Sequence, residues 1–164
     1  MQRMILIGIV VLGLLSASGL PAQGADGGFP EVMIILDGSG SMWGKTGDQT
    51  KIEAAKQVVS QLVPSLPAEV KLGLAAYGHR RKGSCEDIEI IIPGGSSDRE
   101  RLLEQVHQIS PKGKTPIAGS VRMVVDHLKT HENETTIILV SDGEETCHPD
   151  PCGLVEKLKS TGIK

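Results

Sequence analysis

The sequence of 164 residues contains very few aromatic side chains: one Trp, one Tyr and one Phe, which together make up 2% of the chain. A surface that binds nucleic acid by stacking bases on aromatic rings is therefore not expected. An excess of positive charge is lacking as well, because the formal net charge is -3. The short basic run at 79–82 is typical of a solvated loop. We expect no nucleic-acid partner, and a hydrophobic core built from Ile, Leu and Val.

The apolar run near the N-terminus is too short to be a typical membrane span. It covers Met4 to Leu15, which is 12 residues, whereas a spanning helix needs about 20. The positive Arg3 precedes the run, and small residues and a proline follow it over 16–25. This order is typical of a secretory signal peptide, which we assign to residues 1–25. We therefore expect export to the periplasm or the extracellular space. An uncleaved signal sequence is the alternative, and only it would place the protein on a membrane.

Cysteines are also few, with three in the chain. Cys147 and Cys152 bracket a short loop that holds two prolines, and in an oxidising compartment this spacing predicts a disulfide between them. A thiolate metal site with His148 is the alternative, although zinc sites usually need four ligands. Cys85 is then free, pairs outside the chain, or displaces one of the other two cysteines.

Apolar strand-like runs alternate with segments of helical periodicity along the rest of the chain. The runs that predict strands cover 31–36, 70–77, 88–92 and 135–140, and helices are predicted over 51–63, 98–109, 116–128 and from 151 onward. The loop before the third strand is too short for a crossover helix, so that strand is expected to run antiparallel to the second. The pattern predicts an α/β, doubly wound, mostly parallel sheet with helices on both faces and one antiparallel edge strand.

Three helix starts carry capping patterns. Thr50 with Glu53, and Ser97 with Glu100, have the spacing of a capping box. Thr115 is expected to cap a helix that begins at the following proline.

Two carboxylates stand at the ends of predicted strands. Asp37 ends the first strand and Asp142 follows the fourth. Right-handed crossovers place these strands side by side, so both side chains are expected to face one crevice at the carboxyl edge of the sheet. Ser39, Ser41 and Thr115 supply hydroxyl groups on loops that reach the same edge. A set of ligands made only of oxygen suits a hard cation such as Mg²⁺, Ca²⁺ or Mn²⁺, and does not suit zinc or copper.

These residues resemble the metal-ion-dependent adhesion site of von Willebrand factor A domains. The resemblance rests on the DGSGS run at 37–41, on Thr115 and on the SDG run at 141–143, and it extends over roughly residues 30–164. It implies that Ser39, Ser41 and Thr115 contact the metal, Mg²⁺ in the first place, while Asp37 and Asp142 act largely through water. It also implies a protein-binding or adhesion module without enzymatic activity. The ion would take an Asp or Glu carboxylate from a partner protein.

We assign residues 26–164 to this domain. The sequence at 76–80 and 145–147 is similar to that of exported bacterial members of the family. Domains of the family continue with two more strands and helices. The domain is therefore expected to be incomplete at its C-terminus, with the strand over 135–140 left as an open edge prone to aggregation.

A Mg²⁺-dependent phosphoryl-transfer hydrolase with Asp37 as nucleophile is the rival hypothesis. Such an active site would resemble that of haloacid-dehalogenase-like enzymes. In these enzymes a second Asp, two residues after the nucleophile, acts as general acid. Ser39 stands at that position and cannot act as an acid near neutral pH. The run Gly113-Lys114-Thr115 does not complete a phosphate-binding loop, because Gln108 stands where the first glycine is required.

Overall fold

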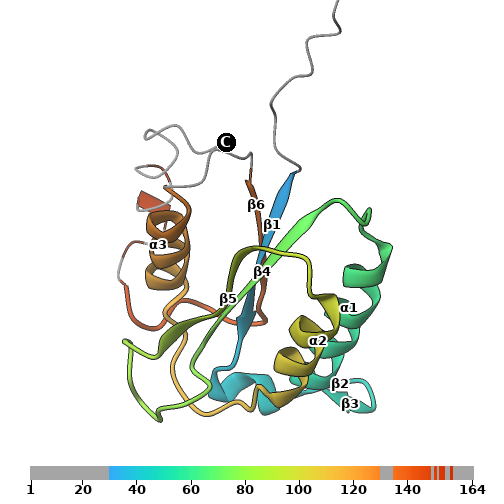
Figure 1. Cartoon of the computed structure of the whole chain (residues 1–164). Helices are drawn as coiled ribbons and strands as arrows, with labels where there is room; N and C mark the ends of the chain where they lie inside the picture. Colours follow the sequence, from blue (N-terminus) through green and yellow to red (C-terminus); the bar gives the residue numbers. More distant parts are fainter. Residues whose placement is uncertain (1–29, 130–134, 149, 151, 154–155, 157–164) are drawn as a thin grey trace, which may run out of the picture.

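The computed structural model describes residues 30–129, 135–148, 150, 152, 153 and 156 (Figure 1). The predicted signal peptide lies outside these residues, as does most of the helix predicted after residue 150. The elements are β1 (Glu31–Asp37), the 3-10 helix η1 (Gly40–Trp43), β2 (Lys45–Thr46), β3 (Gln49–Thr50), α1 (Lys51–Ser65), β4 (Lys71–Tyr77), β5 (Ile88–Ser96), α2 (Arg99–Gln108), α3 (Ile117–Leu128) and β6 (Thr135–Val140). Among the described residues, no helix is both long and apolar enough to cross a membrane.

The main sheet has four strands in the order β5-β4-β1-β6. Strand β1 is parallel to β4 and to β6, with Asp37 beside Tyr77 and Leu36 beside Val140, whereas β4 and β5 are antiparallel. Helices α1 and α2 lie on one face of the sheet and α3 lies on the other (Figure 1). The predicted fold class, its strand neighbours and its antiparallel pair are confirmed.

Strand β1 is buried along its whole length because it packs against helices on both faces. Side chains of a strand alternate between the two faces of a sheet. Ile34 and Leu36 accordingly pack with the residues of α1 and α2. Met33 and Ile35 pack on the other face, with Val124 of α3. This double cover fixes the position of β1, and therefore of the loop that leaves its carboxyl end.

The helix ends follow the predictions in part. The capping box of α1 is confirmed, since the Thr50 hydroxyl accepts a hydrogen bond from Glu53 N and the Glu53 side chain accepts one from Thr50 N. The cap predicted at Ser97 is wrong: Asp98 caps α2 and accepts from Arg101 N at 2.9 Å. Asp98 is one residue nearer to the helix, and its carboxylate is well placed for the N–H groups of the first turn.

Candidate metal centre

Asp37 is the last residue of β1, and its carboxylate is held on both oxygens. The residue is fully buried. Its Oδ1 accepts a hydrogen bond from the backbone N–H of Ser39 at 2.7 Å, and its Oδ2 accepts one from the Ser141 hydroxyl at 2.6 Å. Ser141 in turn accepts from the Tyr77 hydroxyl at 3.2 Å. Burial, followed by the nearby Asp37 carboxylate, raises the pKa of Tyr77, so its hydroxyl keeps its proton and remains a donor.

A chain of hydroxyl groups joins this loop to the end of β6. The Oγ atoms of Ser39 and Ser41 lie 2.9 Å apart, and the Ser41 hydroxyl donates to Oδ1 of Asp142 at 3.0 Å. Because Ser41 uses its single proton on Asp142, Ser39 is the donor to Ser41. The structure thus places Ser39, Ser41 and Asp142 in contact, and Asp37 directly behind them.

Thr115 reaches the same edge from the loop before α3. The residue is buried, with 4% of its surface exposed. Its N–H donates to Oγ1 of Thr146 at 2.9 Å, and its carbonyl accepts from Thr146 N at 3.1 Å. On the other side of the loop, Gly113 O accepts from Gly40 N at 2.9 Å. The loop is therefore fixed between the segment after β1 and the segment after β6.

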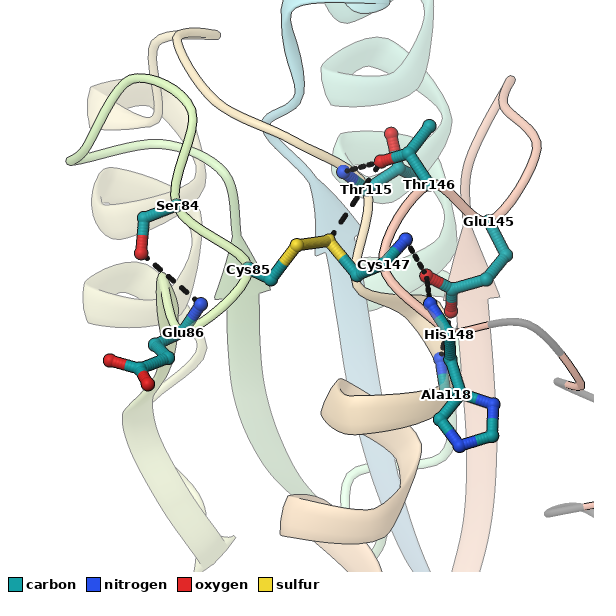
Figure 2. Close-up of a disulfide and its surroundings, with 9 residues drawn as sticks. All are labelled: Ser84, Cys85, Glu86, Thr115, Ala118, Glu145, Thr146, Cys147 and His148. Atoms are coloured by element: carbon teal, nitrogen blue, oxygen red, sulfur yellow. Dashed lines mark hydrogen bonds between the residues drawn. A yellow bond between two sulfur atoms is a disulfide. The ribbon is translucent and has the colours of Figure 1, made fainter.

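The start of α3 is capped from a distant part of the chain. The cap predicted at Thr115 is wrong, because the N-cap residue is Pro116, which forms no side-chain capping bond. The Glu145 carboxylate instead accepts from Ala118 N at 2.7 Å with one oxygen and from Cys147 N at 2.7 Å with the other (Figure 2). A carboxylate at this place suits the positive end of the helix dipole. Glu145 therefore provides the capping interaction that was predicted for Thr115.

A disulfide joins Cys85 to Cys147, and Cys152 is a free, exposed cysteine. The predicted bond between Cys147 and Cys152 is wrong, and so is the thiolate metal site. The pairing in which Cys85 displaces one of the other cysteines is the one observed. Cys85 lies in the loop between β4 and β5, which meets the segment after β6 although 62 residues separate the two cysteines (Figure 2). The spacing along the sequence did not reveal this approach.

Four of the five residues of the predicted site line one open pocket. The pocket has a volume of about 520 Å³, and its lining includes Ser39, Ser41, Thr115 and Asp142. The fifth residue, Asp37, is joined to this lining by the hydrogen bond from Ser39 N. A Cβ placed on Gly143 would lie 3.5 Å from Ser41 Oγ, 3.6 Å from Thr115 Cγ2 and 3.8 Å from Asp37 Oδ2. Gly143 therefore lies within contact range of all three side chains, with Thr115 presenting its methyl group to it.

The chemistry of this donor set fits a hard divalent cation. Hydroxyl and carboxylate oxygens are the ligands that Mg²⁺ and Ca²⁺ prefer. Within the described part of the chain, no group of three or more His, Cys, Asp or Glu side chains is placed to hold a metal. An ion bound here would have to use the hydroxyl oxygens as well as the carboxylates, and the lining residues provide no sulfur ligand for a thiophilic metal.

Several residues that contact the predicted site were not assigned to it from the sequence. Ser141 and Thr146 act through hydrogen bonds to Asp37 and Thr115. Lys51 forms an ion pair with Asp142. Ser141 and Thr146 lie within six residues of the end of the fourth strand, and this position was a usable signal. Lys51 is 91 residues from Asp142, and no pattern in the sequence indicated a contact between them.

Comparison with known proteins decides the family. A model of the von Willebrand factor type A domain matches residues 32–145, a range that includes all five site residues. The chain belongs to the von Willebrand factor type A family. One relative of this A domain is YwmD of Bacillus subtilis strain 168, an uncharacterized protein. The two sequences are 31% identical over an alignment of 167 residues, gaps included, which covers 96% of this chain and 73% of YwmD.

Solved structures agree with this A-domain fold. An aerotolerance-related membrane protein from Bacteroides fragilis NCTC 9343, carrying multiple mutations to serine, superposes with a TM-score of 0.68 at 25% identity, over 82% of this chain and 64% of that one. BatB from Bacteroides thetaiotaomicron, a conserved hypothetical protein, gives a TM-score of 0.66 at 25% identity, over 82% and 63%. The chain thus spans less than two thirds of the length of either structure.

Proposed function

We propose that this A domain binds a divalent cation, Mg²⁺ first, and uses the ion to bind a carboxylate of a partner protein. The observation that carries the proposal is the cluster of oxygen donors at one pocket. Hydrogen bonds link Ser39, Ser41 and Asp142, Thr115 lines the same pocket, and Asp37 accepts from Ser39 N. Ser39, Ser41 and Thr115 would contact the ion. Asp37 and Asp142 would act largely through water. Mn²⁺ and Ca²⁺ are the other ions that this donor set accommodates.

The hydrogen bonds around the carboxylates support this division of roles. Asp37 is buried and both of its oxygens accept hydrogen bonds, so it contributes negative charge from behind the hydroxyl groups. Neutral hydroxyl ligands leave most of the charge of the ion uncompensated. The ion, when bound, supplies a strong positive field at the open side of the pocket, which attracts an Asp or Glu side chain of a partner.

A binding role is favoured over hydrolysis. Proteins of this family generally act in interaction and adhesion rather than as enzymes. In this chain a nucleophilic attack by Asp37 would have to break the hydrogen bonds from Ser39 N and from Ser141 Oγ and then proceed from a fully buried carboxylate. The position of the expected general acid is held by Ser39, whose hydroxyl is directed to Ser41. The geometry therefore gives the hydrolase hypothesis no support.

Export of the protein is part of the proposal. Disulfides form and persist in oxidising compartments and are rare in the cytosol. The bond between Cys85 and Cys147 closes a loop across the domain, and it agrees with the signal peptide predicted over residues 1–25. The periplasm or the extracellular space is then the place where a partner is met.

Titration calorimetry on the exported chain tests this function. We expect Mg²⁺, Mn²⁺ or Ca²⁺ to bind at one site, and the replacements Ser39→Ala and Asp142→Ala to weaken binding by at least tenfold each. Adding a peptide that contains Asp or Glu should produce a further binding heat only when the metal is present. Absence of binding at millimolar metal, or binding by both variants as tight as that of the wild type, would contradict the proposal.

A further inference from the structure

Lys51, the first residue of α1, extends its ammonium group into the candidate metal centre. Its Nζ donates to Oδ2 of Asp142 and forms an ion pair with it. The other oxygen of the same carboxylate accepts a hydrogen bond from Ser41. The Asp142 side chain is 13% exposed and that of Lys51 is 36% exposed, so the pair is partly shielded from solvent. Both oxygens of Asp142 are thus engaged, one by a hydroxyl group and one by a cation of the protein itself.

The start of α1 places Lys51 at this point. The capping box formed by Thr50 ends β3 and fixes the first turn of the helix. The backbone N–H of Lys51 donates to the carbonyl of Gly44 at 2.8 Å. A Cβ on Gly44 would lie 3.4 Å from Cε and 3.6 Å from Nζ of Lys51, which are ordinary contact distances. The Lys51 side chain therefore passes alongside Gly44 on its way to Asp142.

We propose that Lys51 is a built-in competitor of the divalent cation. The inference rests on the function proposed above. The ammonium group neutralises Asp142 while no metal is bound, and it must give up this carboxylate before Asp142 can support the ion. Two positive charges in one partly desolvated pocket also repel each other. Occupation by the ion and the pairing of Lys51 with Asp142 therefore weaken each other by the same factor.

A second lysine provides a matched control within the same pocket. Lys114 also lines it, but no ion pair joins Lys114 to any acidic residue of the described chain. Removing the charge of Lys114 changes the general field at the pocket and leaves Asp142 as it is. Removing the charge of Lys51 changes the field and also frees Asp142. A competitor for one carboxylate is therefore distinguished from a general electrostatic effect.

Calorimetric titration with Mg²⁺ of the wild type, Lys51→Met, Lys51→Arg and Lys114→Met tests the inference. We expect Lys51→Met to lower the dissociation constant on the order of tenfold. Lys51→Arg, which keeps the charge, should stay within about threefold of the wild type, and Lys114→Met should tighten binding clearly less than Lys51→Met. Equal affinity of Lys51→Met and the wild type, or equal gains from Lys51→Met and Lys114→Met, would overturn the competitor role and leave the metal site standing. If neither the wild type nor Lys51→Met binds, the proposed function fails, and this inference fails with it.

The unsubstituted protein offers a second test. Acetylation of individual lysines with and without saturating Mg²⁺ can be followed by mass spectrometry. Lys51 should react several times faster with the metal present, because its partner is withdrawn. Lys129, whose Nζ lies 2.6 Å from Asp126 on α3, serves as the paired lysine away from the pocket, and its rate should not change. A Lys51 rate that is unaffected by saturating metal would overturn the inference.

Discussion

Thr115 and Thr146 are joined by two hydrogen bonds, one in each direction, although 31 residues separate them. One bond uses the side chain of Thr146, with its Oγ1 accepting from Thr115 N at 2.9 Å. Thr146 therefore positions the proposed metal ligand Thr115 without being a ligand itself. Residues of this kind typically change metal affinity 10- to 100-fold when they are lost.

Thr146→Val is expected to weaken Mg²⁺ binding about tenfold, because the N–H of the buried Thr115 loses its acceptor. The free energy of unfolding should fall by only about 1 kcal/mol. Thr146→Ser keeps the hydroxyl and should bind like the wild type. Calorimetry together with urea unfolding separates the two quantities. Equal affinity of the Val and Ser variants would show that this bond does not position Thr115.

The disulfide between Cys85 and Cys147 is expected to stabilise the domain by about 4 kcal/mol in the chain-entropy description, since it closes a loop of about 62 residues. Cys85→Ser should lower the free energy of unfolding by an amount near this value. Cys152→Ser, at an exposed free cysteine, should leave it almost unchanged. Urea unfolding of both variants without reductant measures the difference. A non-reducing peptide map that linked Cys147 to Cys152 would contradict the observed pairing.

The stability of the loop between β4 and β5 should depend on acid through Asp87. Burial opposes ionisation of this carboxylate, but hydrogen bonds from the N–H groups of Arg81 and Arg80, and from the Arg80 side chain, lower its pKa below the usual value. A carboxylate with a lowered pKa in the folded state stabilises the fold above its unfolded pKa, about 3.9, and loses this contribution as the pH falls through the folded value.

Asp87→Asn should therefore lower the free energy of unfolding by about 2 kcal/mol at pH 7, because two backbone donors lose a charged acceptor. The gap to the wild type should shrink as the pH is lowered below about 4. Urea unfolding at several pH values measures both effects, and the exposed Asp48→Asn serves as control. A gap that stays constant from pH 7 to pH 2.5 would show that Asp87 does not contribute through its ionised form.

Much of the fold could be predicted because its causes are local. The apolar run of β1 follows from cover on both faces, and the start of α1 follows from the contact between Thr50 and Glu53, which are three residues apart. The convergence of Asp37 and Asp142 at one edge also follows from strand order and the handedness of crossovers.

Contacts between segments that are distant in the sequence could not be predicted. Cys147 had two possible partners, and spacing favoured the nearer one, whereas the packing of two loops selects Cys85. Glu145, in the segment after β6, caps α3, so the cap predicted from the residue next to the helix, Thr115, was wrong. In each case the decisive neighbour is set by tertiary packing, which overrides a local preference.

Gly143→Ala tests whether the open point between Ser41, Thr115 and Asp37 is needed for binding. The added Cβ would make ordinary contacts of 3.5 to 3.8 Å with these side chains, and Gly143 does not have a positive φ. The free energy of unfolding should therefore change by about 0.5 kcal/mol or less. The affinity for Mg²⁺ should fall at least tenfold, because the methyl group takes up space that the ion needs. Unchanged affinity in a folded Gly143→Ala protein would place the ion elsewhere.

The location of a bound ion tests the central claim most directly. Mn²⁺ broadens the NMR signals of nuclei close to it, so a titration of the isotope-labelled protein maps its position. The account predicts that the amide signals of Ser39, Ser41, Thr115 and Gly143 broaden first, that excess Mg²⁺ restores them, and that the double replacement of Ser39 and Ser41 by Ala abolishes the effect. Broadening that begins at acidic residues away from this pocket, or that persists in the double variant, would contradict the account.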